Sequence, residues 1–160
     1  MRNLSVAFIF IALVVGCGGG EGQSSGRTTA PSADVARTAG GEAITTADGS
    51  AVSKKAHSKW ESALDEFEAN EKTGWTSAQC SSTSKAFERV SEAQGGGFAE
   101  ALYMAGLSLS RCGDDGAYGH YEAALKVDSK FCKARVAMGL RDLRNGRLRD
   151  AKSTFEESIK

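Results

Sequence analysis

Residues 99–106 read AEALYMAG, and small or aromatic residues follow them at Gly113, Ala117, Tyr121 and Ala124. The pattern recurs after 33 or 34 residues, in the pairs Gly106 and Gly139, Gly113 and Gly146, Ala117 and Ala151, Tyr121 and Phe155, Ala124 and Ser158, and Leu125 and Ile159. A period of this length with two helices per unit is typical of a helical solenoid. We therefore predict an all-α solenoid of antiparallel helix pairs.

The repeated unit has the residues that close helix packing needs. Small residues such as Gly106 and Ala117 let the two helices of a unit cross closely, while Tyr121 fills the space beside them. The motif resembles the tetratricopeptide repeat (TPR), and the resemblance covers two units in residues 99–160. Ser129 departs from it, because the repeat usually has proline at this point.

The preceding residues, 53–98, show helical stripes without the repeat signature. Trp60 and Phe67 lie on one apolar stripe, and Thr76 with Gln79 three residues later forms a capping box at the start of a second helix. No segment alternates with a period of two. We expect a degenerate helical hairpin here.

Residues 1–16 have the layout of a secretory signal, with Arg2 followed by an apolar run that is too short to span a bilayer comfortably. The residues Val14-Val15-Gly16-Cys17 resemble the lipobox of bacterial lipoproteins, in which the cysteine thiol is lipidated and the signal is removed before it. We therefore predict a lipid anchor at Cys17. The alternative is a plain signal peptide with an unmodified cysteine.

Residues 17–52 are rich in Gly, Ser, Thr and Ala and contain few large apolar side chains. Such a segment buries too little surface to offset the loss of chain entropy on folding. We predict a flexible linker that holds the helical domain away from the lipid. Gly18 follows the cysteine in place of the aspartate that commonly retains lipoproteins at the inner membrane, so an outer-membrane, periplasm-facing location is favoured.

The chemistry-bearing residues predict no enzyme, no cofactor and no metal site. The chain has 20 basic and 20 acidic residues and only two histidines, and it has no glycine-rich phosphate loop after a strand. Cys112, His120 and Cys132 have spacings that fit no zinc pattern. The acidic residues around Trp60 are expected on a solvated helix face. A basic excess between Lys126 and Lys152 indicates either solvation or an acidic protein partner, and nucleic acid is not expected beyond a secretory signal.

The first helix of each repeat presents side chains toward the concave face of a solenoid. In this register the positions are Glu100, Tyr103, Leu107, Ser110 and Arg111 in one unit and Lys133, Val136, Leu140, Leu143 and Arg144 in the next. We predict a partner-binding surface with an apolar floor and a basic rim, made by Tyr103, Leu107, Arg111, Val136, Leu140 and Arg144. The alternative is that another helix, from a continuation of the chain or from a second subunit, covers this face.

The cysteines predict one disulfide. After lipidation of Cys17 three thiols are left in an oxidising compartment, so one intramolecular pair forms and one cysteine is odd. In an antiparallel stack the start of one unit's second helix lies beside the end of the next unit's first helix. We therefore expect Cys80 to pair with Cys112, and Cys132 to stay free.

The combination of lipobox, linker and repeats resembles the TPR lipoproteins of the gliding-motility machinery of myxobacteria. The residues that carry this resemblance are Trp75, Cys80, Phe87, Phe98-Ala99-Glu100-Ala101 and Arg111-Cys112-Gly113. It implies a protein-binding scaffold in an envelope complex. Two alternatives stay open: an outer-membrane assembly or cell-wall-associated TPR lipoprotein, and a thiol-active redox protein, although no cysteine pair has the CxxC spacing. Completeness of the chain is also open, because it ends without the polar closing helix that solenoids need.

Overall fold

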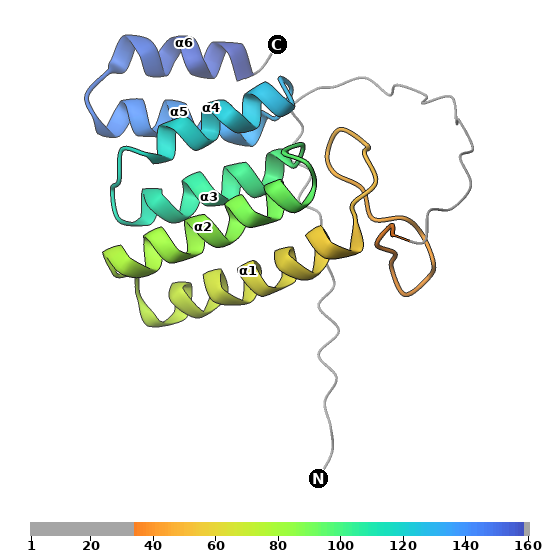
Figure 1. Ribbon diagram of the computed structural model, residues 1–160. Coiled ribbons are helices and arrows are strands. Elements are labelled where there is room, and N and C mark those ends of the chain that lie inside the picture. The colour runs from red at the N-terminus through yellow and green to blue at the C-terminus, as the bar shows by residue number, and fades with distance from the viewer. Residues whose placement is uncertain (1–33, 159–160) are drawn as a thin grey trace.

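The computed structural model describes residues 34–158, and this part of the chain is all-helical apart from three isolated β-bridges. The helices are α1 (Lys54–Thr73), α2 (Ser77–Ala93), α3 (Ala99–Arg111), α4 (Ala117–Val127), α5 (Cys132–Arg144) and α6 (Leu148–Ser158). Each helix packs against the next one along the chain, so that α1 lies at one end of the stack and α6 at the other (Figure 1). Within residues 34–158 no helix combines the length and the hydropathy needed to cross a bilayer.

The first helix pair begins and ends where its capping residues dictate. Ser53 accepts a hydrogen bond from the backbone N–H of Ala56 at 3.1 Å, and Gly74 ends α1 with a φ of 96° that favours glycine. The capping box predicted at Thr76 and Gln79 is confirmed, because each side chain bonds the other residue's backbone N–H. These signals fix the short turn between α1 and α2.

Two apolar clusters make up the core. The first lies among α1, α2 and α3 and contains a chain of aromatic contacts, in which Trp60 lies 5.4 Å from Phe87 and 5.2 Å from Phe98 between ring centroids. The second lies among α3, α4 and α5 and is built on Tyr121 and Phe131 with small residues between them. The change from large aromatic to small residues coincides with the start of the repeats.

The two predicted repeats contain the same close helix crossing. A Cβ atom on Gly106 in α3 would lie 2.6 Å from the Tyr121 ring in α4, and one on Gly139 in α5 would lie 2.6 Å from the Phe155 ring in α6. No side chain larger than hydrogen fits at either position without a shift of its neighbours. The glycine and aromatic pairs that recur in the sequence therefore form equivalent contacts in the structure.

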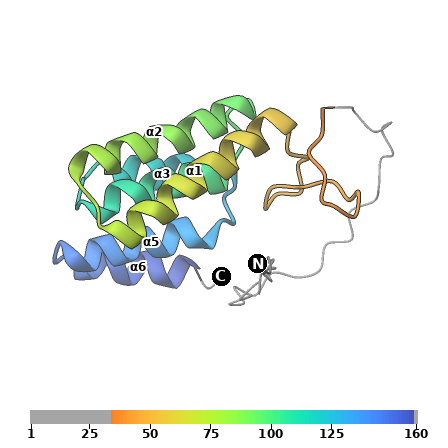
Figure 2. The same cartoon turned by 90° about the horizontal axis from the view of Figure 1, so that it is seen from below.

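Residues 34–53, which we call the strap, differ from the flexible linker expected up to residue 52. Their backbone forms two turns closed by antiparallel bridges, Val35 to Ser53, Arg37 to Ala43 and Thr45 to Ala51. The strap lies beyond the start of α1 (Figure 2), where Val52 enters the first core cluster and Ile44 packs against it. The composition did not reveal this packing, because backbone hydrogen bonds and a few small side chains provide it.

Two side chains of the helical domain bind the strap's backbone. Gln94 accepts a hydrogen bond from Ser53 N at 3.0 Å and donates one to Ala51 O at 2.7 Å. Glu100 in α3 accepts one from Ala47 N at 2.5 Å. The strap is therefore part of the folded domain. The predicted signal in residues 1–16, the lipidation site Cys17 and the linker residues up to 33 lie outside the described residues, as do residues 159–160.

Candidate partner-binding groove

A groove of about 500 Å³ lies between α3 and α5, with Tyr121 of α4 among its lining residues. The helix α3 contributes Tyr103, Leu107, Ser110 and Arg111, and α5 contributes Cys132, Lys133, Val136, Ala137, Leu140, Arg141 and Arg144. On each helix these residues are spaced by about three or four positions, so they share one face. The groove therefore lies between one face of α3 and one face of α5, which are equivalent helices of the two successive repeats.

The side chains of the groove differ in how firmly the fold holds them. Tyr103 contacts the rings of Tyr121 and Phe131, with centroids 5.8 and 5.7 Å apart. Leu107 is half-buried and packs against the first core cluster. Leu140, in contrast, is 50% exposed and belongs to neither cluster. The apolar floor is thus anchored by α3 and left open on α5.

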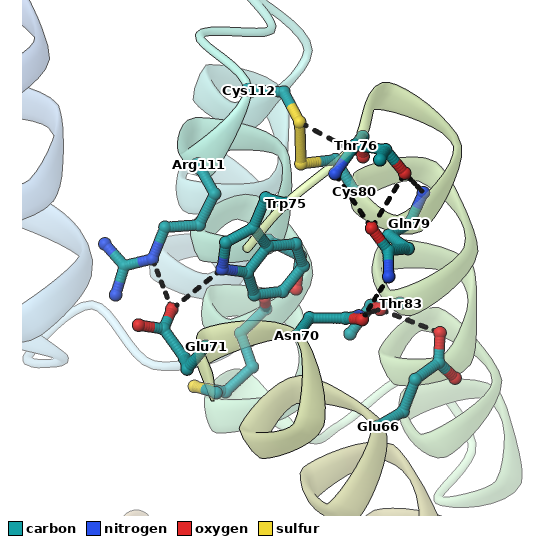
Figure 3. Close-up of a disulfide and its surroundings, with 12 residues drawn as sticks. Glu66, Asn70, Glu71, Trp75, Thr76, Gln79, Cys80, Thr83, Arg111 and Cys112 are labelled. Atoms are coloured by element: carbon teal, nitrogen blue, oxygen red, sulfur yellow. Dashed lines mark hydrogen bonds and ion pairs between the residues drawn. A yellow bond between two sulfur atoms is a disulfide. The ribbon is translucent and has the colours of Figure 1, made fainter. Parts of the chain in front are cut away.

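All the charged residues that line the groove are basic. Arg111 is bound by Glu71 of α1, with 2.6 Å between Nε and Oε1, and Glu71 also accepts a hydrogen bond from the indole of Trp75 (Figure 3). Arg141 is paired with Asp115. Lys133 and Arg144 make no ion pair with any residue from 34 to 158, and both are exposed. The groove therefore carries two cations that the described chain does not neutralise.

The two tyrosines of the groove stay neutral at physiological pH. Burial raises the pKa of Tyr103, and the nearby phenol of Tyr121 raises it further. Burial also raises the pKa of Tyr121, whose hydroxyl oxygen lies 2.8 Å from that of Ser110. Because an ordinary tyrosine already titrates near pH 10, neither ring adds negative charge to the basic groove.

The structure brings together the six residues predicted to bind a partner, since Tyr103, Leu107, Arg111, Val136, Leu140 and Arg144 all line this groove. Two other positions from the same register lie elsewhere. Glu100 binds the strap, and Leu143 contributes to an apolar patch with Leu148 and Phe155 at the α6 end of the stack. Leu107 has a second role, because it also packs against the first core cluster.

Four lining residues were not predicted from the sequence, and one of them is Cys132 in the first turn of α5. Ala137 and Arg141 are at the edge of the α5 face, and the Tyr121 ring reaches the groove from α4. The signal for Tyr121 was present, because the ring that crosses a glycine of α3 must emerge near the groove-facing side of that helix. Arg141 carried no such signal, since its position depends on the long-range pairing with Asp115.

A disulfide joins Cys80, in the first turn of α2, to Cys112 at the end of α3 (Figure 3). This is the pair expected from the sequence, and the Cα atoms lie 6.3 Å apart. The expectation of a free thiol at Cys132 is wrong, because Cys132 is also disulfide-bonded.

Polar residues next to the disulfide form a continuous network between α1 and α2 (Figure 3). The buried side chain of Asn70 donates to Thr83 Oγ1 at 3.0 Å and accepts from Gln79 Nε2 at 2.8 Å. Thr83 in turn donates to Glu66 at 2.7 Å. The capping residue Gln79 is thereby connected to the α1 interface, so the disulfide lies in a structurally fixed corner beside Arg111.

The histidines and the remaining cysteines do not come together as metal ligands. His120 lies 3.3 Å from Glu88 and His57 lies 3.5 Å from Glu61, each across a helix surface. Cys112 is committed to its disulfide. Between residues 34 and 158 no cluster of three or more His, Cys, Asp or Glu side chains is arranged to hold a metal ion. The groove is therefore the strongest candidate site in this part of the chain.

No protein-family model, curated protein or solved structure matches the chain. The fold and the groove are therefore described from this chain's own residues alone.

Proposed function

We propose that the protein is a lipid-anchored, periplasm-facing scaffold with a TPR-like solenoid that binds another protein in its α3–α5 groove and performs no reaction. The observation that carries this proposal is the groove itself, which has an apolar floor, an exposed Leu140 and a rim of basic side chains. Interfaces between proteins combine these features, with apolar residues at the centre and polar ones around them. The TPR assignment is supported by the recurrence of the glycine and aromatic crossing.

The location of the protein is proposed from the sequence. The lipobox resemblance at Cys17 and the Gly18 that follows it support an outer-membrane location of the mature chain, facing the periplasm. A disulfide between α2 and α3 agrees with an oxidising compartment. The specific envelope complex that we propose is the gliding-motility machinery, on the resemblance of the motifs around Cys80 and Cys112.

The binding function is tested by one substitution in the groove and a matched control. Leu140→Asp changes a half-exposed residue of the groove, whereas Leu148→Asp changes a leucine that is 66% exposed and lies in the α6 end patch. We expect Leu140→Asp to abolish capture of a protein from solubilised envelopes at an unchanged melting temperature. Leu148→Asp keeps that capture. Equal capture by both variants would refute the groove as the binding site.

The anchor is tested separately. A multiply acylated cysteine gives near-permanent membrane attachment, so Cys17→Ser protein expressed in its natural host partitions into the aqueous phase of a detergent extraction or stays unprocessed. Recovery of a processed Cys17→Ser protein in the detergent phase would contradict the lipid anchor. This result would leave the groove proposal intact, because the two experiments examine different parts of the chain.

A further inference from the structure

The unneutralised cations of the groove occupy the two ends of one helix face. Lys133, Val136, Leu140 and Arg144 follow each other at i, i+3, i+7 and i+11 along α5, which places all four on one side of the helix. With a rise of about 1.5 Å per residue, the Cα atoms of Lys133 and Arg144 lie roughly 16 Å apart. Between them α5 lines the groove with Val136, Ala137 and Leu140, and with Arg141, which is paired with Asp115.

The other two cations of the groove are already committed. Glu71 holds Arg111 and Asp115 holds Arg141, so these guanidinium groups need no ligand charge. No carboxylate from residues 34–158 lines the groove. A ligand that fills it therefore meets an apolar centre with one available positive charge at each end.

We propose that the groove accepts a partner helix of about three turns that has an apolar centre and a carboxylate near each end, one for Lys133 and one for Arg144. This inference rests on the proposed function and specifies the chemistry of the partner. A helix of this length spans the distance between the two cations, and its apolar side chains recur at the same spacing as Val136 and Leu140. An amphiphile with a single anionic head group neutralises only one end, so the two-ended charge pattern favours a protein helix over a lipid.

The proposal is tested with synthetic peptides and the folded protein. The first peptide is a 15-residue alanine and leucine helix with Glu at positions 2 and 13, and the second has Lys at both positions. Fluorescence anisotropy measures their binding to the complete mature chain in low and in physiological salt. We expect the acid-ended peptide to bind at least tenfold more tightly than the lysine-ended one, with a difference that shrinks as salt rises.

Charge reversal on the protein supplies the matched test. Lys133→Glu and Arg144→Glu each weaken the acid-ended peptide by about five- to tenfold, and the double variant prefers the lysine-ended peptide. Lys152→Glu, an exposed lysine of α6 outside the groove, is the control and leaves both affinities unchanged. Melting temperatures of these variants stay close to that of the parent, because neither groove cation is paired within residues 34–158.

The outcomes separate this inference from the proposed function. Absence of binding by the acid-ended peptide, or equal binding of both peptides, overturns the inferred partner chemistry. If envelope capture still depends on Leu140 in that case, the scaffold function stands with a different partner. Binding of anionic phospholipid vesicles that is lost with Arg144→Glu, without binding of either peptide, also overturns the inference and identifies a lipid ligand. Capture that is unaffected by Leu140→Asp refutes the proposed function itself.

Discussion

The N-terminal region, residues 54–98, and the C-terminal region, residues 99–158, use different means to hold their helices together. In the first, large rings fill the space between helices, and Trp60, Phe67, Phe87 and Phe98 form one connected aromatic cluster. In the second, glycines bring helices so close that a single ring spans each crossing. The first arrangement gains stability from buried area, while the second gains a repeatable geometry.

This difference between the two regions helps to explain where the candidate groove lies. The aromatic region forms the larger apolar cluster, which Val52 of the strap joins. The glycine region leaves one face of α5 open, with Leu140 half-exposed and Arg144 available. Helices that cross closely leave less room for side chains between them, so more of their side chains lie at the surface. The candidate groove therefore lies mainly in the region with the smaller core.

The largest effect is expected from truncating the aromatic cluster. Phe87 is fully buried, and its replacement by alanine should lower the free energy of unfolding by about 3–5 kcal/mol, measured by urea denaturation. Phe155→Ala in the C-terminal region removes a half-buried ring and should cost only about 1 kcal/mol. Equal losses at the two positions would show that the regions do not differ in how they are stabilised.

Removal of the disulfide should have the next largest effect, because it connects α2 of the first region to the end of α3 in the second. The double variant Cys80→Ser with Cys112→Ser frees a loop closed over 32 residues and should lose about 3–4 kcal/mol of unfolding free energy. A double variant as stable as the parent would mean that the two regions are held together without the disulfide.

The glycine crossings should show a smaller and graded effect. Gly106→Ala places a methyl group against both the Tyr121 ring and the backbone carbonyl of Ala117 at 2.9 Å, so we expect a loss of about 1–2 kcal/mol in urea denaturation. Gly139→Ala meets only the edge of the Phe155 ring, which can turn away, and stays within about 1 kcal/mol of the parent.

The control for both crossings is Gly119, a helical glycine of α4 with nothing within 4 Å of its added Cβ. Gly119→Ala should stabilise the protein by about 0.5–1 kcal/mol through helix propensity alone. If Gly106→Ala were also stabilising, the close crossing would not be a determinant of the fold.

The smallest effect is expected at Glu100, where the strap meets α3. Burial raises the pKa of this carboxyl, and Oε2 is buried without a hydrogen-bond partner in residues 34–158. The pKa of Glu100 is therefore higher in the folded state than in the unfolded state. The favourable contribution of the protonated carboxyl to the free energy of unfolding is complete below about pH 4.5, and it is lost as the pH rises through the folded-state pKa.

Comparison with Glu100→Gln isolates this contribution. The parent should lose stability relative to the glutamine variant between pH 4 and pH 7 in paired urea titrations. Glu68→Gln, on the exposed side of α1, is the control. If the difference in unfolding free energy between the parent and Glu100→Gln is constant across this range, the ionisation of Glu100 does not affect the stability of the strap.

The sequence predicted those structural features that depend on residues close together in the chain or on adjacent helices. The capping box at Thr76, the crossing of Gly106 by Tyr121 and the groove positions on α3 and α5 follow from spacing within one or two helices. The pairing of Cys80 with Cys112 followed from the antiparallel order of those helices. Each of these features depends on contacts within one helix or between helices that lie next to each other in the stack.

Features that depend on the choice between distant partners could not be predicted. The strap was expected to be a linker because small residues such as Ala36 and Thr46 give no hydrophobic signal, yet both are buried. Asp142 is also buried and is held by Arg147 at 2.6 Å, although its stretch of sequence indicated a basic surface, either solvated or bound to an acidic partner. In each case hydrogen bonds compensate for a burial that residue type alone disfavours.

The strap gives the protein a mechanical property. Its first residue, Asp34, lies beside the start of α1, where Asp34 O accepts from Lys54 N and Val52 O accepts from Ala36 N. A pulling force at residue 34 therefore opens these bonds one after another, as in unzipping, and not all together in shear. Complete peeling up to residue 53 releases about 20 residues, or roughly 65 Å of extended chain. The strap can thus lengthen under load by this amount before any helix has to unfold.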